Sequence, residues 1–151
     1  MGALMRFAYK FVHKHTVEIE PATGESIHST CLLGFFSSEI KCKEAIPYYL
    51  KQPGFKDYPD DFVIEEVEAD IDDFNDNGGE FESIVFYLSH EYYDGEYDYV
   101  TDLGYYSSRQ LAEKALIKYQ ADSDLAKHPD GFCINECKID KREWLEGFFT
   151  Y

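Results

Sequence analysis

The residues best suited to chemistry in this chain are carboxylates gathered in one stretch without a basic residue. Between Lys56 and Arg109 there is no lysine or arginine, yet this stretch holds 17 of the chain's 30 aspartates and glutamates. The rest of the chain, with 13 acids and 14 bases, is close to neutral. A local field of one sign is typical either of a solvated linker or of a surface that attracts a basic partner.

Tyrosines accompany the acids in the second half of this stretch, from Tyr87 to Tyr106. Tyrosine is common at the centre of interfaces because it buries a large ring and keeps a polar tip, and neighbouring carboxylates speed association with a cationic protein. Among these tyrosines we expect the loop residues to be exposed, namely Tyr92, Tyr93 and Tyr97. The predicted partner-binding residues are Asp72, Asp73, Asp76, Glu80, Glu82, Tyr92, Tyr93, Asp94, Glu96, Tyr97 and Asp98.

Residue types suited to catalysis or metal binding form weaker patterns. His13 and His90 occupy corresponding places in two similar segments, and a shared pocket using both is an alternative hypothesis. The segment Asp73-x-Asn75-x-Asn77-Gly78 matches the first half of a calcium loop, but Ile84 stands where the bidentate glutamate belongs, so calcium binding stays open. The sequence has no nucleophile motif, phosphate-binding loop or cofactor motif, so we predict neither catalytic residues nor a cofactor.

Length and composition narrow the class of protein. The 151 residues, 44% of them hydrophobic, can build a core, which excludes a disordered acidic tail. A net charge of −16 argues against direct binding to nucleic acid or to an anionic membrane. No stretch approaches the ~18 apolar residues of a membrane span. Four cysteines without metal-ligand spacing predict reduced thiols and a cytoplasmic location.

Two parts of the chain repeat one pattern. The run Leu33-Gly34-Phe35-Phe36-Ser37-Ser38 recurs 70 positions later as Leu103-Gly104-Tyr105-Tyr106-Ser107-Ser108. The same offset relates Pro59-Asp60 to Pro129-Asp130 and continues through the apolar residues that follow. Upstream, Tyr9-x-Phe11-x-His13 matches Phe86-x-Leu88-x-His90 at an offset of 77. This self-similarity predicts a duplicated module.

Each copy carries the signals of two strands, a helix and a third strand. Apolar stretches at 7–13 and 84–90 predict first strands, and Ser38 and Ser108 are the expected helix N-caps. Pro47 lies inside the first predicted helix, so we expect a bend or an early break there. The predicted fold class is α+β: two tandem β-β-α-β repeats whose antiparallel-rich sheets are each covered by one helix. The repeats span 7–75 and 83–151, joined by an acidic, glycine-bearing linker at 76–82, and form one compact unit.

Several of these motifs also resemble a family. Leu-Gly-aromatic-aromatic-Ser-Ser, Pro53-Gly54-Phe55, Pro-Asp-x-Phe-x-Ile and the closing Glu143-Trp144-Leu145-Glu146-Gly147-Phe148 are similar to a small uncharacterised bacterial domain family. The resemblance covers most of the second copy and the middle of the first. The second copy has Ser123-Asp124-Leu125 in place of Pro-Gly-Phe, and the first lacks the closing motif. The resemblance implies a fold and a bacterial source, and it assigns no catalytic residue.

These observations predict a non-enzymatic, cytoplasmic bacterial binding protein. Its most concrete form is an immunity or inhibitor protein that neutralises a basic partner, such as a nuclease toxin, through the acidic, tyrosine-rich surface. One alternative is a small enzyme or ligand-binding domain with a pocket between the repeats that uses His13 and His90. Another is a nucleic-acid mimic whose carboxylates are spaced about as phosphates are. The sequence does not indicate an oligomeric state.

Overall fold

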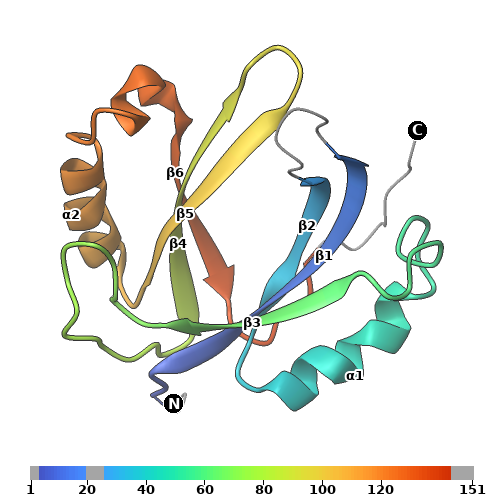
Figure 1. Cartoon of the computed structure of the whole chain (residues 1–151). Helices are drawn as coiled ribbons and strands as arrows, with labels where there is room; N and C mark the ends of the chain where they lie inside the picture. The colour runs from blue at the N-terminus through green and yellow to red at the C-terminus, as the bar shows by residue number, and fades with distance from the viewer. Residues whose placement is uncertain (1–3, 20–25, 144–151) are drawn as a thin grey trace. The chain divides into compact units, whose positions relative to one another are not determined.

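The computed structural model describes residues 4–19 and 26–143, and the chain forms an α+β fold with two three-stranded antiparallel sheets and two helices (Figure 1). The strands are β1 (Phe7–Ile19), β2 (Ser26–Phe36), β3 (Phe62–Glu68), β4 (Ile84–Tyr93), β5 (Asp98–Tyr106) and β6 (Phe132–Lys138). The helices are α1 (Glu39–Tyr49) and α2 (Arg109–Tyr119), and two 3₁₀ turns, η1 (Leu125–Lys127) and η2 (Pro129–Gly131), precede β6. The predicted α+β class is confirmed.

The chain divides into two compact units, each with one sheet and one helix. The α2 unit consists of the chain up to Ala8 together with Val67–Ile139, and its sheet has the order β5-β4-β6. The α1 unit consists of Tyr9–Glu66 and the chain from Asp140 onward, and its sheet has the order β2-β1-β3. These two units are defined by which residues pack together. The repeats at 7–75 and 83–151 are defined by sequence similarity, and their borders stay a prediction.

Both helices begin where the serines predict. The side chain of Ser38 accepts a hydrogen bond from the Lys41 amide, and that of Ser108 accepts one from the Leu111 amide, each at 3.2 Å. These bonds satisfy one of the free amides in each first turn, which is the role of an N-cap. The expected early break at Pro47 is wrong, because α1 continues to Tyr49. Its last turn is closed by the Leu50 amide, which donates to the Ile46 carbonyl at 2.9 Å.

Each helix packs on its own sheet through a buried aromatic cluster. In the α1 unit, Phe11, Leu33 and Tyr49 are fully buried together, and the Tyr49 hydroxyl donates to the Leu33 carbonyl at 3.1 Å. In the α2 unit, Leu103 and Tyr119 belong to the buried cluster, and the Tyr119 hydroxyl donates to the Leu103 carbonyl at 3.0 Å. Burying one such side chain contributes about 1.5–3 kcal/mol, so these clusters hold each helix on its sheet.

In the α2 unit, a buried carboxylate fixes the turn that leads into α2. Asp70 has a left-handed backbone (φ 62°), and its own amide donates to the Tyr105 carbonyl at 2.8 Å. Its carboxylate accepts from the Ser107 amide at 2.8 Å and from the Ser107 hydroxyl at 2.7 Å. A side chain at Gly79 would collide with this carboxylate, since a β-carbon there would lie 1.9 Å from its oxygen. The glycine therefore lets the linker close over Asp70.

In the α1 unit, Asp140 makes the corresponding contacts at the start of α1. Its φ is 69°, its amide donates to the Phe35 carbonyl at 2.8 Å, and its carboxylate accepts from the Ser37 amide at 2.8 Å. The Lys41 ammonium lies 3.0 Å from the same carboxylate. Partial burial raises the pKa of Asp140, but the hydrogen bonds from Ser37 and Lys41 outweigh burial, and the pKa lies below its usual range.

The lowered pKa predicts how Asp140 contributes to stability as the pH changes. A carboxyl whose pKa is lower in the folded chain stabilises the fold above the unfolded value of about 3.9, and this contribution is lost as pH falls through the folded value. Asparagine tolerates the left-handed backbone, so Asp140→Asn removes mainly the charge. We expect the variant to lose about 1 kcal/mol of unfolding free energy at neutral pH. Urea unfolding should show this difference shrinking in acid.

The matched control is Asp57→Asn, which removes the same charge from an exposed position of the α1 unit. Its unfolding free energy should stay within about 0.5 kcal/mol of the parent chain, because exposed substitutions away from special contacts have small effects. An equal loss in the two variants, or a difference for Asp140→Asn that persists in acid, would contradict the role given to the Asp140 carboxylate.

Candidate functional site

The turn between β4 and β5 is held by Asp94. Its side chain accepts hydrogen bonds from the amides of Glu96 and Tyr97, both at 2.8 Å, and Gly95 supplies the positive φ of 101° that the turn requires. These backbone hydrogen bonds lower the pKa of Asp94, with the Tyr97 amide the largest cause. The Tyr93 hydroxyl donates to the Gly95 carbonyl at 2.8 Å. The turn therefore presents a fixed carboxylate beside a tyrosine ring.

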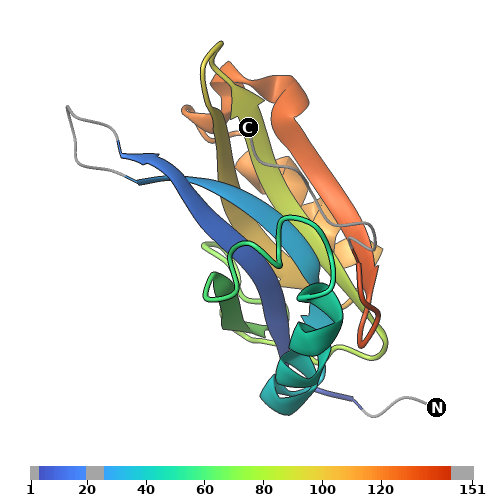
Figure 2. The same cartoon turned by 90° about the vertical axis from the view of Figure 1, so that its right-hand side faces the viewer.

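The end of the hairpin next to this turn is exposed on both faces. The first five residues of β5, from Asp98 to Asp102, are all exposed, although strand alternation would bury every second one against a core. Tyr93 is 63% exposed and Val100 is 57% exposed. Figures 1 and 2 show this hairpin extending to the end of the sheet that lies away from the linker. It combines apolar surface with carboxylates on a backbone held by the sheet.

Two tyrosines expected to be exposed are half-buried. The ring of Tyr92 stacks on His128 with 3.9 Å between ring centroids and 3° between planes. The ring of Tyr99 stacks on Tyr92 with 5.0 Å between centroids. Tyr97 is also half-buried, so among the three only Tyr93 is exposed. The expectation failed for Tyr92 because η1 and η2 carry His128 against the hairpin, a contact that the hairpin's own sequence does not indicate.

The predicted acids between β3 and β4, in the linker and just before it, have different roles in the structure. Asp72 is half-buried, and its carboxylate accepts from the amides of Phe74 at 2.7 Å and Asn75 at 2.8 Å and from the Tyr106 hydroxyl. It therefore shapes the loop. The other four predicted acids before β4 are exposed and could face a partner: Asp73, Asp76, Glu80 and Glu82.

The structure brings the predicted residues together as two groups. The acids from Asp72 to Glu82 precede β4 and the turn acids follow it, so the ten-residue strand separates the groups by roughly 30 Å at about 3.4 Å per residue. In Figure 1 the linker and the hairpin turn lie at opposite ends of the α2 unit's sheet. A small contact patch can include only one of the two groups. Glu91, Glu96 and Asp98, at the turn end, are exposed and have no ion-pair partner among the described residues.

The two histidines of the alternative hypothesis are each buried within a different unit. His13 Nε2 donates to the Tyr58 carbonyl at 2.9 Å, and His90 Nε2 donates to the His128 carbonyl at 2.8 Å. Each ring packs edge-on against an aromatic ring, Phe62 for His13 at 5.0 Å and Phe132 for His90 at 4.7 Å. Both histidines thus tie a loop to a strand, which is the usual arrangement of structural histidines.

The residues of the calcium-like segment make hydrogen bonds within their own loop and to Tyr119 of α2. Asn75 Oδ1 accepts from the Asn77 amide at 3.0 Å, and the Asp73 amide donates to the Tyr119 hydroxyl at 3.3 Å. Within the described part of the chain, no three His, Cys, Asp or Glu side chains are placed to hold one metal ion. These contacts account for the run of Asp and Asn as loop chemistry.

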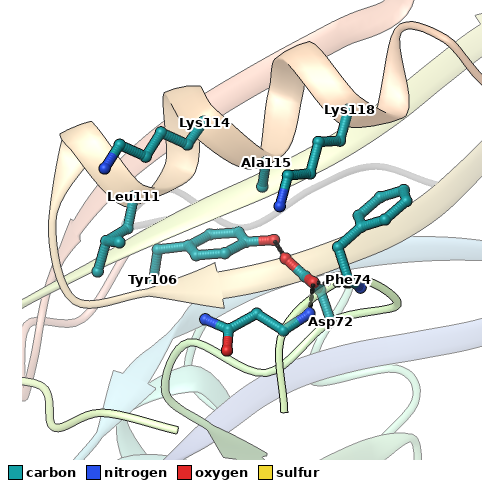
Figure 3. Close-up of a pocket in the computed structure, with 8 residues that line it drawn as sticks. Asp72, Phe74, Tyr106, Leu111, Lys114, Ala115 and Lys118 are labelled. Carbon is teal, nitrogen blue, oxygen red and sulfur yellow. Dashed lines mark hydrogen bonds between the residues drawn. The ribbon is translucent and has the colours of Figure 1, made fainter. Parts of the chain in front are cut away.

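A slot beside α2 was not anticipated from the sequence. Between the helix and the loop at 72–75 lies a cavity of about 270 Å³, whose walls include Lys114 and Lys118 (Figure 3). The spacing of these lysines, four apart on a predicted helix, was visible in the sequence. The loop that faces them was not, because its position depends on the contacts of Asp72 with Tyr106.

Comparison with known proteins gives no relative. No family model, curated protein or solved structure matches this chain. Among the described helices, none is long and apolar enough to cross a membrane. Trp144, which belongs to the closing motif of the family resemblance, lies outside the described residues. The candidate site therefore rests on the geometry of the α2 unit.

The cysteines differ in accessibility, which predicts selective labelling. Cys31, Cys42 and Cys137 are buried, and burial raises the pKa of Cys31 to about 11 and that of Cys42 to about 12. Because the thiolate is the reactive species, these groups should react slowly, whereas Cys133 is exposed. We expect a chromogenic disulfide reagent to label one thiol quickly in the native chain and all four in urea. Cys133→Ser should remove the fast phase, and a fast phase that survives this change would contradict the assignment.

Proposed function

We propose that this chain is a non-enzymatic cytoplasmic protein of bacterial origin that binds and neutralises a basic protein, as an immunity protein does with its toxin. The observation that carries the proposal is the exposed β4–β5 hairpin end, where five consecutive exposed residues of β5 follow a turn rich in carboxylates. Tyr93 supplies exposed aromatic surface there. Aromatic rings beside unpaired carboxylates suit a cationic protein surface.

In the proposed mechanism the hairpin blocks its partner by occupying a basic surface. The carboxylates of Glu96 and Asp98 pair with lysines or arginines that the partner needs for its own substrate, and Tyr93 packs between them. The backbone of the turn is fixed by Asp94, so little ordering is needed on binding. The exposed linker acids, including Asp76 and Glu80, add to the long-range attraction.

The spacing of acids along β5 favours a protein-binding role over nucleic-acid mimicry. A mimic would need carboxylates about 7 Å apart on one side of the strand, which is the distance between alternate residues. On β5 the residue midway between Asp98 and Asp102 is Val100, and it is exposed. An apolar residue at this point suits a mixed protein interface.

The proposal predicts a salt-sensitive complex with a basic protein. The full chain, used as bait in an extract of its source cells at low salt, should recover a basic protein that is released as salt is raised, because screening weakens charge pairs. The pair of changes Glu96→Gln and Asp98→Asn should weaken binding roughly tenfold, measured by titration calorimetry with the recovered protein.

The matched control removes two charges from the other end of β4, through Asp76→Asn and Glu80→Gln. Because both variants change the net charge equally, a contact role for the hairpin requires a clearly larger loss for the hairpin variant. Recovery of no basic protein, binding that ignores salt, or equal losses in the two variants would contradict the proposal.

We also propose that the fold arose by tandem duplication of a β-β-α-β module, as the sequence pattern predicts. Equivalent hydrogen bonds separated by 70 positions support this. Asp70 with Ser107 corresponds to Asp140 with Ser37, and in both pairs the carboxylate accepts from the serine amide and hydroxyl. In each case the aspartate follows the third strand of one copy and holds the helix start of the other copy.

A stacked pair of rings supports the duplication in a second way. In the α1 unit His15 stacks on Tyr58 at 3.6 Å, and in the α2 unit Tyr92 stacks on His128 at 3.9 Å. Position 92 follows position 15 by 77, and position 128 follows position 58 by 70, which are the two offsets of the sequence repeat. The two ring types have therefore exchanged places while the contact is kept.

Each compact unit contains a segment from the other copy of the repeat. We therefore expect that one copy cannot fold alone. A fragment ending at residue 82 lacks Asp140 and also Glu143, whose carbonyl accepts from the buried Tyr49 hydroxyl at 2.5 Å. We expect this fragment to show no cooperative thermal transition by circular dichroism. Co-expression with residues 83–151 should restore one, since each unit then has all its segments. A cooperative transition of the isolated fragment would contradict the requirement for the exchanged ends.

A further inference from the structure

The slot beside α2 has two walls that are fixed by hydrogen bonds. On one side is the helix face that carries Lys114, Ala115 and Lys118, and on the other is the loop of Asp72–Asn75, with Leu111 and Tyr106 completing the lining. Figure 3 shows the Tyr106 ring between the helix and the loop, with its hydroxyl directed at the Asp72 carboxylate. The cavity of about 270 Å³ approaches the lower end of the range typical of small-molecule sites.

The loop wall is held in place independently of any ligand. The Asp72 amide donates to the Asn75 carbonyl at 2.9 Å, and the Asp72 carboxylate accepts from the Phe74 and Asn75 amides. The ring of Phe74 packs edge-on against Tyr119 with 4.8 Å between centroids. A site whose walls are already ordered loses little entropy on binding, so even a small ligand can bind measurably.

The positive charges that line the slot are available to a ligand, whereas the negative charge is not. The only carboxylate among its lining residues, Asp72, is already bonded to the loop amides and to the Tyr106 hydroxyl. The two ammonium groups have neither a hydrogen bond nor an ion pair within the described part of the chain. Lys118 lies over the Phe74 ring at 5.6 Å, which directs it toward the slot. The slot therefore offers positive charge to an anion.

The remaining lining favours an organic body over a bare inorganic ion. Leu111 is half-buried and Phe74 is 48% exposed, so these two side chains provide apolar surface at the slot, whereas Tyr106 and Ala115 are buried in the core. We propose that this slot binds a small organic anion, a carboxylate carried on a flat apolar ring, with the carboxylate between Lys114 and Lys118 and the ring against Leu111 and Phe74. This site is separate from the hairpin and does not depend on the proposed function.

The α1 unit contains a cavity that serves as an internal comparison. It has about 340 Å³ and is lined by Lys41, Glu44 and Arg142 among others. There Lys41 is paired with Asp140 at 3.0 Å, and Arg142 lies over the Tyr48 ring at 3.9 Å. Because Lys41 is paired with Asp140 and Glu44 adds a negative charge, this cavity should not take the same ligand.

The test is a titration of the full chain with sodium benzoate, followed by heteronuclear NMR at constant ionic strength. We expect saturable shifts at Leu111, Ala115 and Phe74, and no comparable shift at Ala45 in the cavity of the α1 unit. Benzamide, which has the ring without the charge, and sodium acetate, which has the charge without the ring, should both bind at least about tenfold more weakly. Benzoate without saturable shifts at the slot, or benzamide or acetate binding as well as benzoate, would overturn the proposal.

The variants separate the slot from the general charge of the protein. Lys114→Gln with Lys118→Gln should weaken benzoate binding about tenfold, since two charge-assisted contacts are removed. Lys43→Gln with Lys51→Gln removes the same charge from exposed positions of the α1 unit and should leave benzoate affinity within about twofold. All four lysines are exposed, so both variants should keep the parent's amide spectrum. Equal losses in the two variants would overturn the proposal.

Discussion

A carboxylate at a left-handed turn, bonded to the amide and hydroxyl of a serine, is the interaction on which both units depend. It joins the end of a third strand to the residue before a helix N-cap, through Asp70 at α2 and Asp140 at α1. Without it, the helix start would have fewer acceptors for its amides, and the strand end would lose its anchor. This turn and the buried aromatic cluster of each unit together fix the position of the helix on its sheet.

The candidate interaction surface follows from the way this core is built. Because the buried cluster of the α2 unit does not include the start of β5, the residues from Asp98 to Asp102 are exposed on both faces of the strand. A ribbon of this kind is stabilised by its turn and by the stack of Tyr92 on His128. Its carboxylates can repel one another at little cost, since water screens them there. The fold therefore tolerates the negative charge of the hairpin because these carboxylates are exposed to solvent.

The sequence predicted the elements well and the contacts between distant segments poorly. Alternation, serine caps and the 70-residue repeat indicated the strands and the starts of both helices, because these depend on neighbouring residues. The half-burial of Tyr92 and the loop-shaping role of Asp72 depend on His128 and Tyr106, which are more than thirty positions away in the chain. The run of acids in the sequence likewise indicated an acidic surface. It did not indicate that the acids form two groups, which are separated by the length of β4.

The exchange of chain ends between the units also sets an order for folding during synthesis. The α2 unit has all of its segments once Ile139 has been made, whereas the α1 unit needs Asp140, which accepts from Ser37 about a hundred residues earlier. As the chain leaves the ribosome, β1, β2 and α1 therefore emerge first and are completed last. During that interval the aromatic residues of the α1 cluster depend on their own packing, and on chaperones where it fails, to avoid aggregation.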